Sequence, residues 1–428
     1  MQEDIFDVII VGGGLAGCTA AYVLAKAGRE VLVIERGNYS GSKNMTGGRL
    51  YGHSLERIIP GFADEAPVER KVTREKISFL TQDSGVTLDY QNAAQQDAQA
   101  CSYTVLRGEF DAWLMSKAED EGAQAIPGVR VDELIVEDGK VCGVKAGDDE
   151  LYARVVILAD GANSILGEKL GMVKPVTPHH VAVGVKELIE LTPEQMKDRF
   201  GAVNDEGMAW LFAGSPSNGY LGGGFLYTNK TTVSLGIVFG LHNADKTDKS
   251  VPQMLEDFKQ HPIVAPLVAD GKLVEYSAHI VPEGGLDMVP ELVGEGVVIA
   301  GDAAGFCLNV GYTVRGMDLA IASGEAAAKA VLNALEKDDT SKAGLSDYQR
   351  LLEESFIFND MKLYKELPKF LDNPRMFTAY PELVSGVMSD LFTINGPEQP
   401  VRKKLFKRVK QVGIMNLIKD GFKGVRSL

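Results

Sequence analysis

Cysteine is scarce in this chain, and its four cysteines, at positions 18, 101, 142 and 307, form no C-x-x-C pair. This usage fits a reducing compartment, and it excludes a cysteine-ligated cluster or zinc site built from this chain alone. Apolar runs are also short: none reaches the roughly 18 residues that cross a bilayer, and no secretory leader precedes the first predicted strand. We therefore expect a cytoplasmic protein that meets the inner face of the cell membrane only peripherally.

Positive charge is in deficit, because the formal net charge is -15 at pH 7. Such a surface repels a phosphate backbone, so nucleic acid is not expected as a partner. The exception is residues 402–428, where nine Lys or Arg and one acid, Asp420, give a local charge of +8. Leu405, Val409 and Val412 fall on one helical face among these cations. The sequence does not decide what that helix contacts: an anionic membrane, an acidic ferredoxin or only solvent.

Glycine, by contrast, is abundant. The chain has 428 residues, of which 47 are glycine, 45% are hydrophobic and 24% are charged. This is the profile of a globular protein with two lobes, or with one large lobe that contains insertions. Glycine is needed where backbone approaches a ligand or adopts positive φ, so its excess indicates tight turns around a large bound molecule.

The N-terminus contains a dinucleotide-binding pattern. Residues 7–11 read D-V-I-I-V, a run typical of a buried parallel strand, and residues 12–17 fit G-x-G-x-x-G before an Ala-rich helix. These glycines permit the turn, the approach of a pyrophosphate and the packing of helix on strand, while Glu35 ends the next strand and accepts a ribose hydroxyl. Glu35 disfavours a 2′-phosphate, but Arg36 beside it leaves the choice between FAD and NAD open at this point.

A second pattern, far along the chain, distinguishes FAD from NAD as the cofactor. Residues 296–305 read G-V-V-I-A-G-D-A-A-G, a buried strand with Asp302 at its carboxyl end, where open α/β sheets have their crevices. Residues 311–324 read as a loop entering a helix, whose N-terminal amides suit an electron-rich ring. One long ligand reaching from Glu35 to Asp302 explains both acids, and FAD is such a ligand.

These motifs resemble those of the glutathione-reductase-type FAD proteins, which include aromatic hydroxylases, geranylgeranyl reductases and electron-transfer-flavoprotein:quinone oxidoreductases. Four blocks support the resemblance: residues 12–17 with Glu35, Arg107 before a helix, residues 159–161 (A-D-G) after a strand, and residues 301–305. The resemblance implies an α/β fold, namely a Rossmann-like FAD-binding fold with an inserted α+β substrate or quinone domain and a helical C-terminal region.

The same resemblance assigns roles to the cofactor contacts. Gly12, Gly14 and Glu35 are expected to hold the adenosine half of FAD, Arg107 its diphosphate side, and Asp302 its ribityl chain or phosphates. No catalytic base or metal ligand is expected, because flavin supplies the electron chemistry. The predicted contacts, of which Lys43, Asn44, Gly47 and Gly48 are expected to line the isoalloxazine, are Gly12, Gly14, Leu15, Ala16, Gly17, Glu35, Arg36, Lys43, Asn44, Gly47, Gly48, Arg107, Val131, Asp160, Gly161, Gly301, Asp302 and Gly311.

Further blocks narrow the resemblance to the FixC type of quinone oxidoreductase-like dehydrogenases, essentially from end to end. They include residues 43–49 (K-N-M-T-G-G-R), 211–224, 276–279 (Y-S-A-H) and 371–375 (L-D-N-P-R). The related quinone oxidoreductases have a C-terminal ferredoxin domain with a four-cysteine cluster, whereas no cysteine follows Cys307 here. The resemblance therefore implies two partners, a separate ferredoxin-like iron–sulfur protein and an electron-transferring flavoprotein heterodimer, with quinone as a further candidate.

Six segments are predicted along the chain. Residues 131–160 read as a β-meander, and the strands around Asn229 and Lys230 read as a hairpin. The FAD-binding domain takes residues 1–75, 105–175 and 276–345, inserted strands of the second domain take 76–104, the substrate- or quinone-facing domain takes 176–275, and a helical region with the basic tail takes 346–428.

Three functions fit these patterns. The first is electron transfer among an electron-transferring flavoprotein, a ferredoxin and quinone, the second is reduction of prenyl double bonds, and the third is NAD(P)H-dependent aromatic hydroxylation. Hydroxylases commonly place an arginine where this chain has Leu166 and Gly167, and a histidine where it has Gly305, which disfavours the third. The uncharged residues 207–229 are either a surface facing lipid or quinone or the interior of the second sheet.

The histidines and cysteines are expected to be structural. His179 and His180 are adjacent and therefore face apart, which does not suit a shared site. Cys18 and Cys307 lie inside cofactor motifs, where a buried small hydrophobe is the favoured reading.

Overall fold

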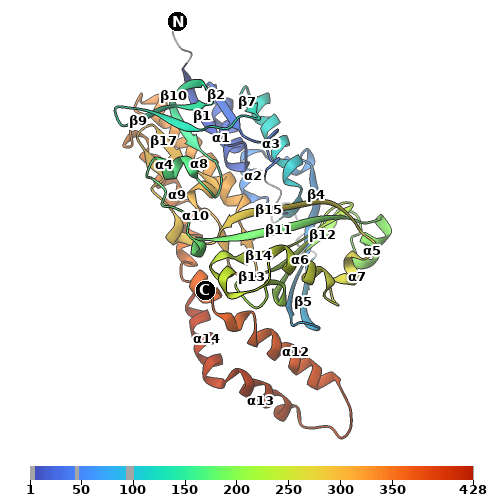
Figure 1. Cartoon of the computed structure of the whole chain (residues 1–428). Coiled ribbons are helices and arrows are strands. Elements are labelled where there is room, and N and C mark those ends of the chain that lie inside the picture. The colour runs from blue at the N-terminus through green and yellow to red at the C-terminus, as the bar shows by residue number, and fades with distance from the viewer. Residues whose placement is uncertain (1–4, 44–47, 93–100, 428) are drawn as a thin grey trace.

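Two β-sheets form the body of the protein (Figure 1). The computed structural model describes residues 5–43, 48–92 and 101–427. The core of the first sheet is parallel, and Val8 lies between Val155 and Val31 in register, with all three side chains buried. In spatial order its strands are β16 (Val293–Gly294), β17 (Val297–Ile299), β10 (Asp149–Leu158), β1 (Phe6–Val11), β2 (Val31–Glu35) and β7 (Gln124–Pro127), with β9 (Lys140–Ala146) on β10 and β8 (Glu133–Glu137) on β9.

Long helices pack on the first sheet because small residues let them approach closely. A Cβ atom at Gly324 of α8 would lie 2.2 Å from the backbone oxygen of Ala16 in α1, so only glycine fits that contact. Most of α8 is buried as a result. The helices of this lobe are α1 (Leu15–Lys26), α2 (His53–Ile58), α3 (Arg107–Asp120), α4 (Ile165–Lys169), α8 (Met317–Glu336), α9 (Asp347–Glu354) and α10 (Phe356–Leu363).

The second sheet has nine strands and its own hydrophobic core. Trp210 stacks on Phe212, and Phe258 meets Phe212 edge to face, so α6 seals one side of this sheet. Its strands are β15 (Lys272–Pro282), β11 (Val181–Glu190), β14 (Thr232–Gly240), β13 (Gly222–Thr228), β12 (Glu206–Gly214), β4 (Val68–Leu80), β6 (Ser102–Val105) and β3 (Arg49–Tyr51), with β5 (Gly85–Gln91) on β4; its helices are α5 (Pro193–Phe200), α6 (Val251–Gln260) and α7 (Ala265–Val268).

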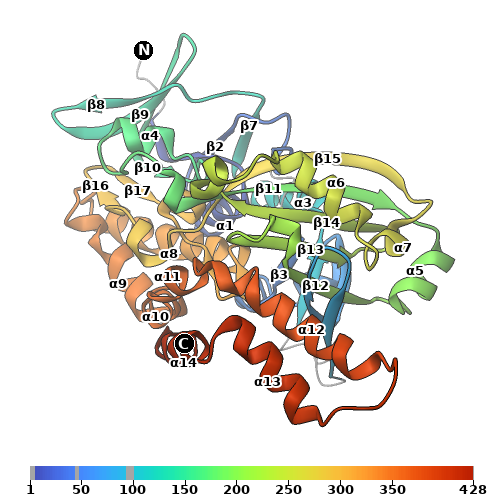
Figure 2. The same ribbon diagram turned by 60° about the horizontal axis from the view of Figure 1, so that its bottom comes forward.

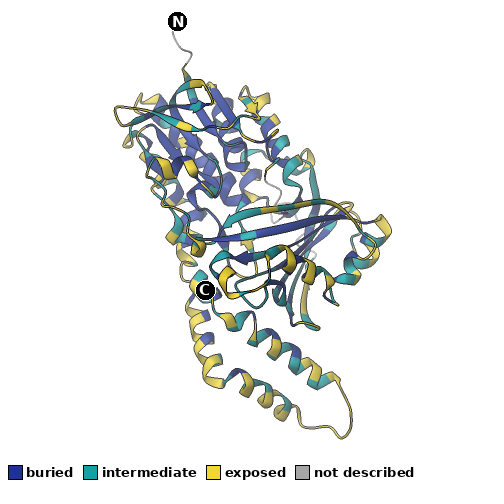
Figure 3. Ribbon diagram, in the orientation of Figure 1, coloured by how far each residue is buried: buried dark blue, intermediate teal, exposed yellow. Residues whose placement is uncertain are grey.

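A helical arm ends the chain, and it projects from the body in both views (Figures 1 and 2). Its helices are α11 (Leu367–Leu371), α12 (Ala379–Phe392), α13 (Val401–Val412) and α14 (Ile414–Ser427). Arg408 of α13 forms a two-point ion pair with Asp390 of α12, at 2.6 and 2.7 Å. Burial colouring shows that α13 and α14 are largely exposed (Figure 3). Within the described parts of the chain, no helix is both long enough and apolar enough to cross a bilayer.

The predicted α/β fold with its helical C-terminal region is confirmed. The meander appears as β8, β9 and β10, and β13 and β14 form the predicted hairpin. Two helices begin earlier than predicted, since α1 starts at Leu15 and α3 at Arg107. The six-segment division stays a prediction, and β4 and β15 run across its boundaries at 75/76 and 275/276.

The uncharged residues 207–229 lie partly in the interior of the second sheet, as one reading predicted, and partly on a cavity wall; contact with lipid or quinone stays a prediction. Met208, Trp210 and Phe212 are buried in the core of the second sheet. Leu211 and Tyr227, by contrast, line the large cavity described below. The alternation of strand side chains places the same segment on both faces.

Candidate functional site

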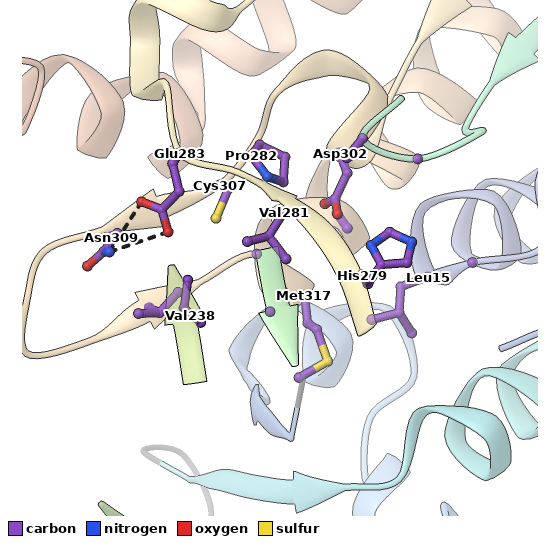
Figure 4. A pocket seen from close by; sticks show the side chains of 18 of the residues that line it. Leu15, Val238, His279, Val281, Pro282, Glu283, Asp302, Cys307, Asn309 and Met317 are labelled. Atoms are coloured by element: carbon purple, nitrogen blue, oxygen red, sulfur yellow. Dashed lines mark hydrogen bonds between the residues drawn. The ribbon is translucent and has the colours of Figure 1, made fainter. Parts of the chain in front are cut away.

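A cavity of about 820 Å³ runs between the two sheets. One wall is the carboxyl edge of the first sheet, where β1, β2, β10 and β17 end. The opposite wall comes from β11 to β15 of the second sheet, and residues 367–377 close one end. Figure 4 shows side chains from both walls, including Leu15, Val238 and His279, around this space. A ligand here would lie at the edge where open α/β sheets bind theirs.

The loop between β1 and α1 is shaped for a pyrophosphate. Gly12 has a φ of 105°, and a Cβ atom there would lie 2.3 Å from the backbone oxygen of Ala159. Gly14 caps α1 without a side chain, and the first turn of the helix has no acid. Gly12, Gly14, Leu15 and Ala16 all line the cavity, so the free amides of α1 face a place where an anion can sit.

Glu35 lies beside this loop at the end of β2. Its carboxylate accepts hydrogen bonds from the backbone N–H groups of Gly13, at 2.7 Å, and Gly37, at 2.5 Å. Both Glu35 and Arg36 line the cavity. Gly17 does not line it: a Cβ atom there would lie 2.0 Å from the backbone oxygen of Gly12, so this glycine serves packing.

Arg107, the first residue of α3, lines the middle of the cavity. Its guanidinium donates two hydrogen bonds of 2.7 Å to the buried carboxylate of Asp111. Burial opposes its charge, yet Asp111 and Asp302 hold the pKa of Arg107 above its usual value. A fixed cation therefore faces the cavity. Lys43 and Gly48 also line it, whereas Asn44 and Gly47 lie outside the described residues.

Two acids end neighbouring parallel strands. Asp160 follows β10, and its Oδ1 atom is buried without a hydrogen-bond partner. Burial raises the pKa of Asp160 to about 6, against the weak donation of the Leu166 N–H at 3.5 Å. Asp302 follows β17, and burial raises its pKa although Arg107 and His279 favour its ionised form.

The remaining predicted contacts complete the wall. Val131 and Gly161 line the cavity near Asp160, and Gly301 and Gly311 line it on either side of the loop after β17. Gly301 and Gly311 have φ values of 67° and 82°, which favour glycine. In all, the structure brings every described predicted residue except Gly17 to one cavity.

These residues fit FAD. The orphaned Oδ1 atom of Asp160 is a buried acceptor that needs a donor, and the uncapped start of α1 needs an anion. Arg107 lies between these two ends of the wall and supplies positive charge for a diphosphate. When bound, FAD supplies the transfer of electrons, while the chain supplies position and electrostatics. As residue roles, these contacts remain predictions.

Several residues that line the cavity were not predicted from the sequence. His279 and Glu283 line it from β15 and the residue after it, and Met376 and Phe377 line it from the C-terminal region. No spacing rule links residue 377 to a loop at residue 12, because the arm folds back onto the cavity only in three dimensions. Charged or polar residues at the end of an apolar strand, such as Glu283 after residues 280–282, were the available signal.

The other histidines and cysteines have structural surroundings. The ring of His179 stacks on that of His242, with centroids 4.9 Å apart. Cys18 is fully buried, whereas Cys307 lines the cavity, and burial raises the pKa of both thiols. In the parts of the chain that the structure describes, no three His, Cys, Asp or Glu side chains gather as a metal site requires.

Comparisons with known families agree with this architecture. The family model "FAD dependent oxidoreductase" matches residues 7–163. The model "ETF-QO, ubiquinone-binding" matches residues 181–281, and the model "ETF-QO/FixC family C-terminal domain" matches residues 367–428. The first segment holds most strands of the first sheet together with β3 to β6 of the second, the second segment holds β11 to β14 and most of β15, and the third segment is the helical arm.

Known relatives match over the entire chain. Protein FixC of Salmonella typhi is 62% identical over 429 residues, which cover 100% of both chains. The probable electron transfer flavoprotein-quinone oxidoreductase YdiS of Escherichia coli is 61% identical with the same coverage.

Solved structures share the fold at low identity. A geranylgeranyl bacteriochlorophyll reductase-like protein from Thermoplasma acidophilum has a TM-score of 0.72 at 20% identity, over 99% of this chain and 100% of that one. The myxobacterial halogenase CndH, an FAD-dependent enzyme, has a TM-score of 0.65 at 18% identity, over 95% of this chain and 96% of that one. FAD is therefore the cofactor, and the chain belongs to the FixC and electron-transfer-flavoprotein:quinone oxidoreductase family of FAD-dependent oxidoreductases.

Proposed function

We propose that this oxidoreductase passes electrons among an electron-transferring flavoprotein heterodimer, a separate ferredoxin-like iron–sulfur protein and a quinone. The observation behind the proposal is that the cavity has two unlike parts. One part is the polar dinucleotide edge with Glu35, Arg107 and Asp302. The other part, the apolar lobe, is lined by Ile77, Phe79, Leu211, Ala213, Phe225, Val238, Leu371, Met376 and Phe377.

The apolar lobe suits a quinone because its wall consists mostly of carbon atoms, against which a hydrophobic ring or tail can pack. Leu211 and Val238 come from β12 and β14, which alternate between the sheet core and the lobe. Gly222 and Gly223 bring strand backbone close to the space, with φ values of 141° and 149°. Four of its nine residues, Leu211, Ala213, Phe225 and Val238, fall within the segment that matches the ubiquinone-binding family model, which supports a quinone as its occupant.

The proposed partners follow from what the chain supplies for itself. The four cysteines form no C-x-x-C pair, which supports a separate protein as the source of an iron–sulfur centre for one-electron steps. The name of the relative YdiS, a probable electron transfer flavoprotein-quinone oxidoreductase, supports an electron-transferring flavoprotein as the electron donor or acceptor. The basic residues 402–428 offer an acidic partner a complementary surface.

We further propose that the protein is cytoplasmic and that α14 rests on an anionic membrane surface. Met415, Phe422 and Val425 are 75%, 70% and 78% exposed. Together with Ile414 and Ile418 they recur at helical spacing and form one face, which we call the α14 apolar face. Lys419, Lys423 and Arg426 flank it, as in helices that lie in a lipid interface.

The electron-transfer proposal is tested with purified components under anaerobic conditions. The FAD-loaded chain, mixed with the reduced flavoprotein heterodimer and a short-chain ubiquinone, should form hydroquinone at a rate that depends on both proteins. Val238→Asp places a charge in the apolar lobe, so the KM for quinone should rise at least about tenfold while bound FAD, followed by absorbance, is retained. Val274→Asp, on an exposed position of β15, is the matched control.

Two results would contradict the proposal. One is a chain that is purified without partners and is fully active with NADPH, which indicates hydroxylase-type chemistry. The other is loss of prenyl unsaturation, seen by mass spectrometry, with no quinone turnover. The second result would favour a prenyl reductase, a function that the apolar lobe and the shared fold also accommodate.

A further inference from the structure

Glu283 places a carboxyl group inside the cavity at the point where β15 has just ended. Its backbone N–H donates to the carbonyl of His180 at 2.8 Å, which fixes the turn. Figure 4 shows the side chain pointing toward Asn309, with Cys307 nearby. The carboxyl is half-buried and adjoins Leu221 and Leu371, so it lies beside the apolar lobe.

Asn309 holds this carboxyl in one orientation. The Asn309 Nδ2 atom lies 3.2 Å from Oε2 and 3.4 Å from Oε1 of Glu283. The side-chain oxygen of Asn309 accepts the backbone N–H of Gly311 at 2.9 Å, which turns the amide nitrogen toward Glu283. Asn309 is therefore a positioning residue for the carboxyl.

The surroundings of Glu283 favour the protonated carboxyl. Burial raises the pKa of Glu283 to about 7, although the hydrogen bond from Asn309 favours the ionised form. Within the described part of the chain, no Lys or Arg side chain shifts the pKa of Glu283. The titratable groups nearby on the packed elements are Cys307 and Asp302 from the loop after β17, Tyr364 at the end of α10, His180 before β11, and His279 on β15 itself.

Glu283 also lines a second, smaller cavity. Its volume is about 20 Å³, enough for one water molecule. Glu283, Cys307 and Asn309 line both cavities. Tyr364 lines the small cavity and hydrogen-bonds to Tyr312, which is 50% exposed. Glu283 and Tyr364 thus line one small cavity of the size of a water molecule, and Tyr364 is hydrogen-bonded to the half-exposed Tyr312.

We propose that Glu283 delivers protons to a quinone reduced in the apolar lobe, and that the small cavity with Tyr364 and Tyr312 returns protons to Glu283 from solvent. This inference rests on the proposed function. A quinone leaves as a neutral hydroquinone only after it takes up two electrons and two protons. The electrons come from the partner flavoprotein; each proton leaves a Glu283 O–H bond and forms an O–H bond on the quinone, and water then reprotonates the carboxylate. Such proton transfer typically contributes about 10²- to 10⁴-fold in rate.

The first test uses acceptors that differ in their need for protons. Ferricenium takes one electron and no proton, whereas ubiquinone takes two of each. Glu283→Gln keeps the shape and an oxygen for Asn309, so it should slow quinone reduction at least about tenfold and change ferricenium reduction less than about twofold. In the wild type, quinone reduction should fall as the pH rises through about 7, because the proton donor is then lost, and this fall should vanish in the variant.

Matched variants complete this test. Glu283→Asp keeps a carboxyl group, but the shorter side chain places it farther from the apolar lobe. Relative to Glu283→Gln, this variant should restore part of the quinone reduction rate and part of its pH dependence. Glu194→Gln, on an exposed position of α5, should behave as wild type. The proposal would be overturned if Glu283→Gln slowed the reduction of quinone and of ferricenium equally. It would also be overturned if this variant left the rate and the pH profile of quinone reduction unchanged.

An infrared titration of the FAD-loaded protein separates this proposal from the proposed function. The carbonyl band of a protonated carboxyl should disappear with a midpoint near pH 7, and it should be absent from Glu283→Gln. A wild type that reduces ferricenium but not quinone would refute the quinone function, while this band would still support Glu283 as a proton-holding group. A Glu283 band that titrates near the ordinary glutamate value of about 4.3 would overturn the inference.

Discussion

At the scale of single residues, Glu35 both stabilises a loop and lines the cavity. Its carboxylate braces the loop between β1 and α1 through the amides of Gly13 and Gly37. It also lines the cavity where the ribose of a dinucleotide is expected, so the same oxygens are available to hydroxyl groups. The brace and the ligand contact therefore depend on one negative charge.

Glu35→Gln should weaken FAD binding by about 10- to 150-fold, because a hydrogen bond to a charged group contributes about 1.5–3 kcal/mol. Titration of the apoprotein with FAD, followed by flavin fluorescence, measures the Kd. Glu30→Gln, on an exposed residue just before β2, is the control and should bind as wild type. An unchanged Kd in Glu35→Gln would remove this residue from the binding site.

At the scale of single elements, helix α14 carries an exposed apolar face. Its apolar face is exposed, whereas another side of the helix packs on α11 at Gly424, where an added Cβ atom would lie 3.0 Å from the ring of Phe370. The face predicted from Leu405, Val409 and Val412 of α13 is divided, since Val412 is buried whereas Leu405 is exposed. Membrane contact is therefore argued from α14 rather than from α13.

Phe422→Ser with Val425→Ser removes apolar area from α14 without changing charge. Co-flotation with anionic liposomes should fall at least about tenfold, because these side chains insert into the interface while lysines remain at its surface. Leu273→Ser with Val274→Ser, on exposed positions of β15, should float as wild type. If the α14 variant still floats with salt-sensitive binding, charge alone holds the protein to the vesicles.

At the scale of the whole molecule, an ion pair inside the arm joins α14 to the segment that follows α11. Arg375 donates to both carboxylate oxygens of Asp420 at 2.6 and 2.7 Å, and the hydroxyl of Tyr380 donates to the same carboxylate. Met376 and Phe377, next to Arg375, line the apolar lobe. The only acid of the basic tail thus ties α14 to a wall of the cavity.

Asp420→Asn should loosen α14. The hydrogen bond from Arg375 holds the pKa of Asp420 well below its usual range, so its stabilisation is present above the unfolded-state pKa of about 3.9 and is lost as pH falls through the folded-state pKa. At pH 7 we expect a loss of about 1–2 kcal/mol, at the low end for charged hydrogen bonds because the Arg375 side chain is 35% exposed.

Amide hydrogen exchange in α14 measures this loss. Exchange should be about 5- to 30-fold faster in Asp420→Asn at pH 7; the ratio to wild type should begin to fall below about pH 4 and should approach one only as the pH passes the lower folded-state pKa of Asp420. Asp287→Asn breaks an exposed pair with Lys369 and should change exchange little. A ratio that does not depend on pH would show that packing, and not this charge, holds α14.

Local patterns were sufficient for much of the fold and for one side of the site. The run before Gly12, the glycines after it and the acid after β2 share a short stretch of chain, so their spacing reflects one βαβ unit. The prediction of Asp160 and Asp302 depended on strands that end in acids. Glu283, His279 and Phe377 were not predicted because nothing in their local sequence indicates which cavity they face.

The sequence by itself determined the cofactor class, since a short glycine turn, a helix start and an acid at fixed spacing are local requirements of a bound dinucleotide. It also predicted a separate iron–sulfur protein as a partner, because the four cysteines form no C-x-x-C pair, and this partner stays a prediction. Only the tertiary structure decided how the second sheet and the arm close an apolar lobe around Glu283, because those contacts join residues distant along the chain, and side-chain burial depends on packing rather than on sequence neighbours.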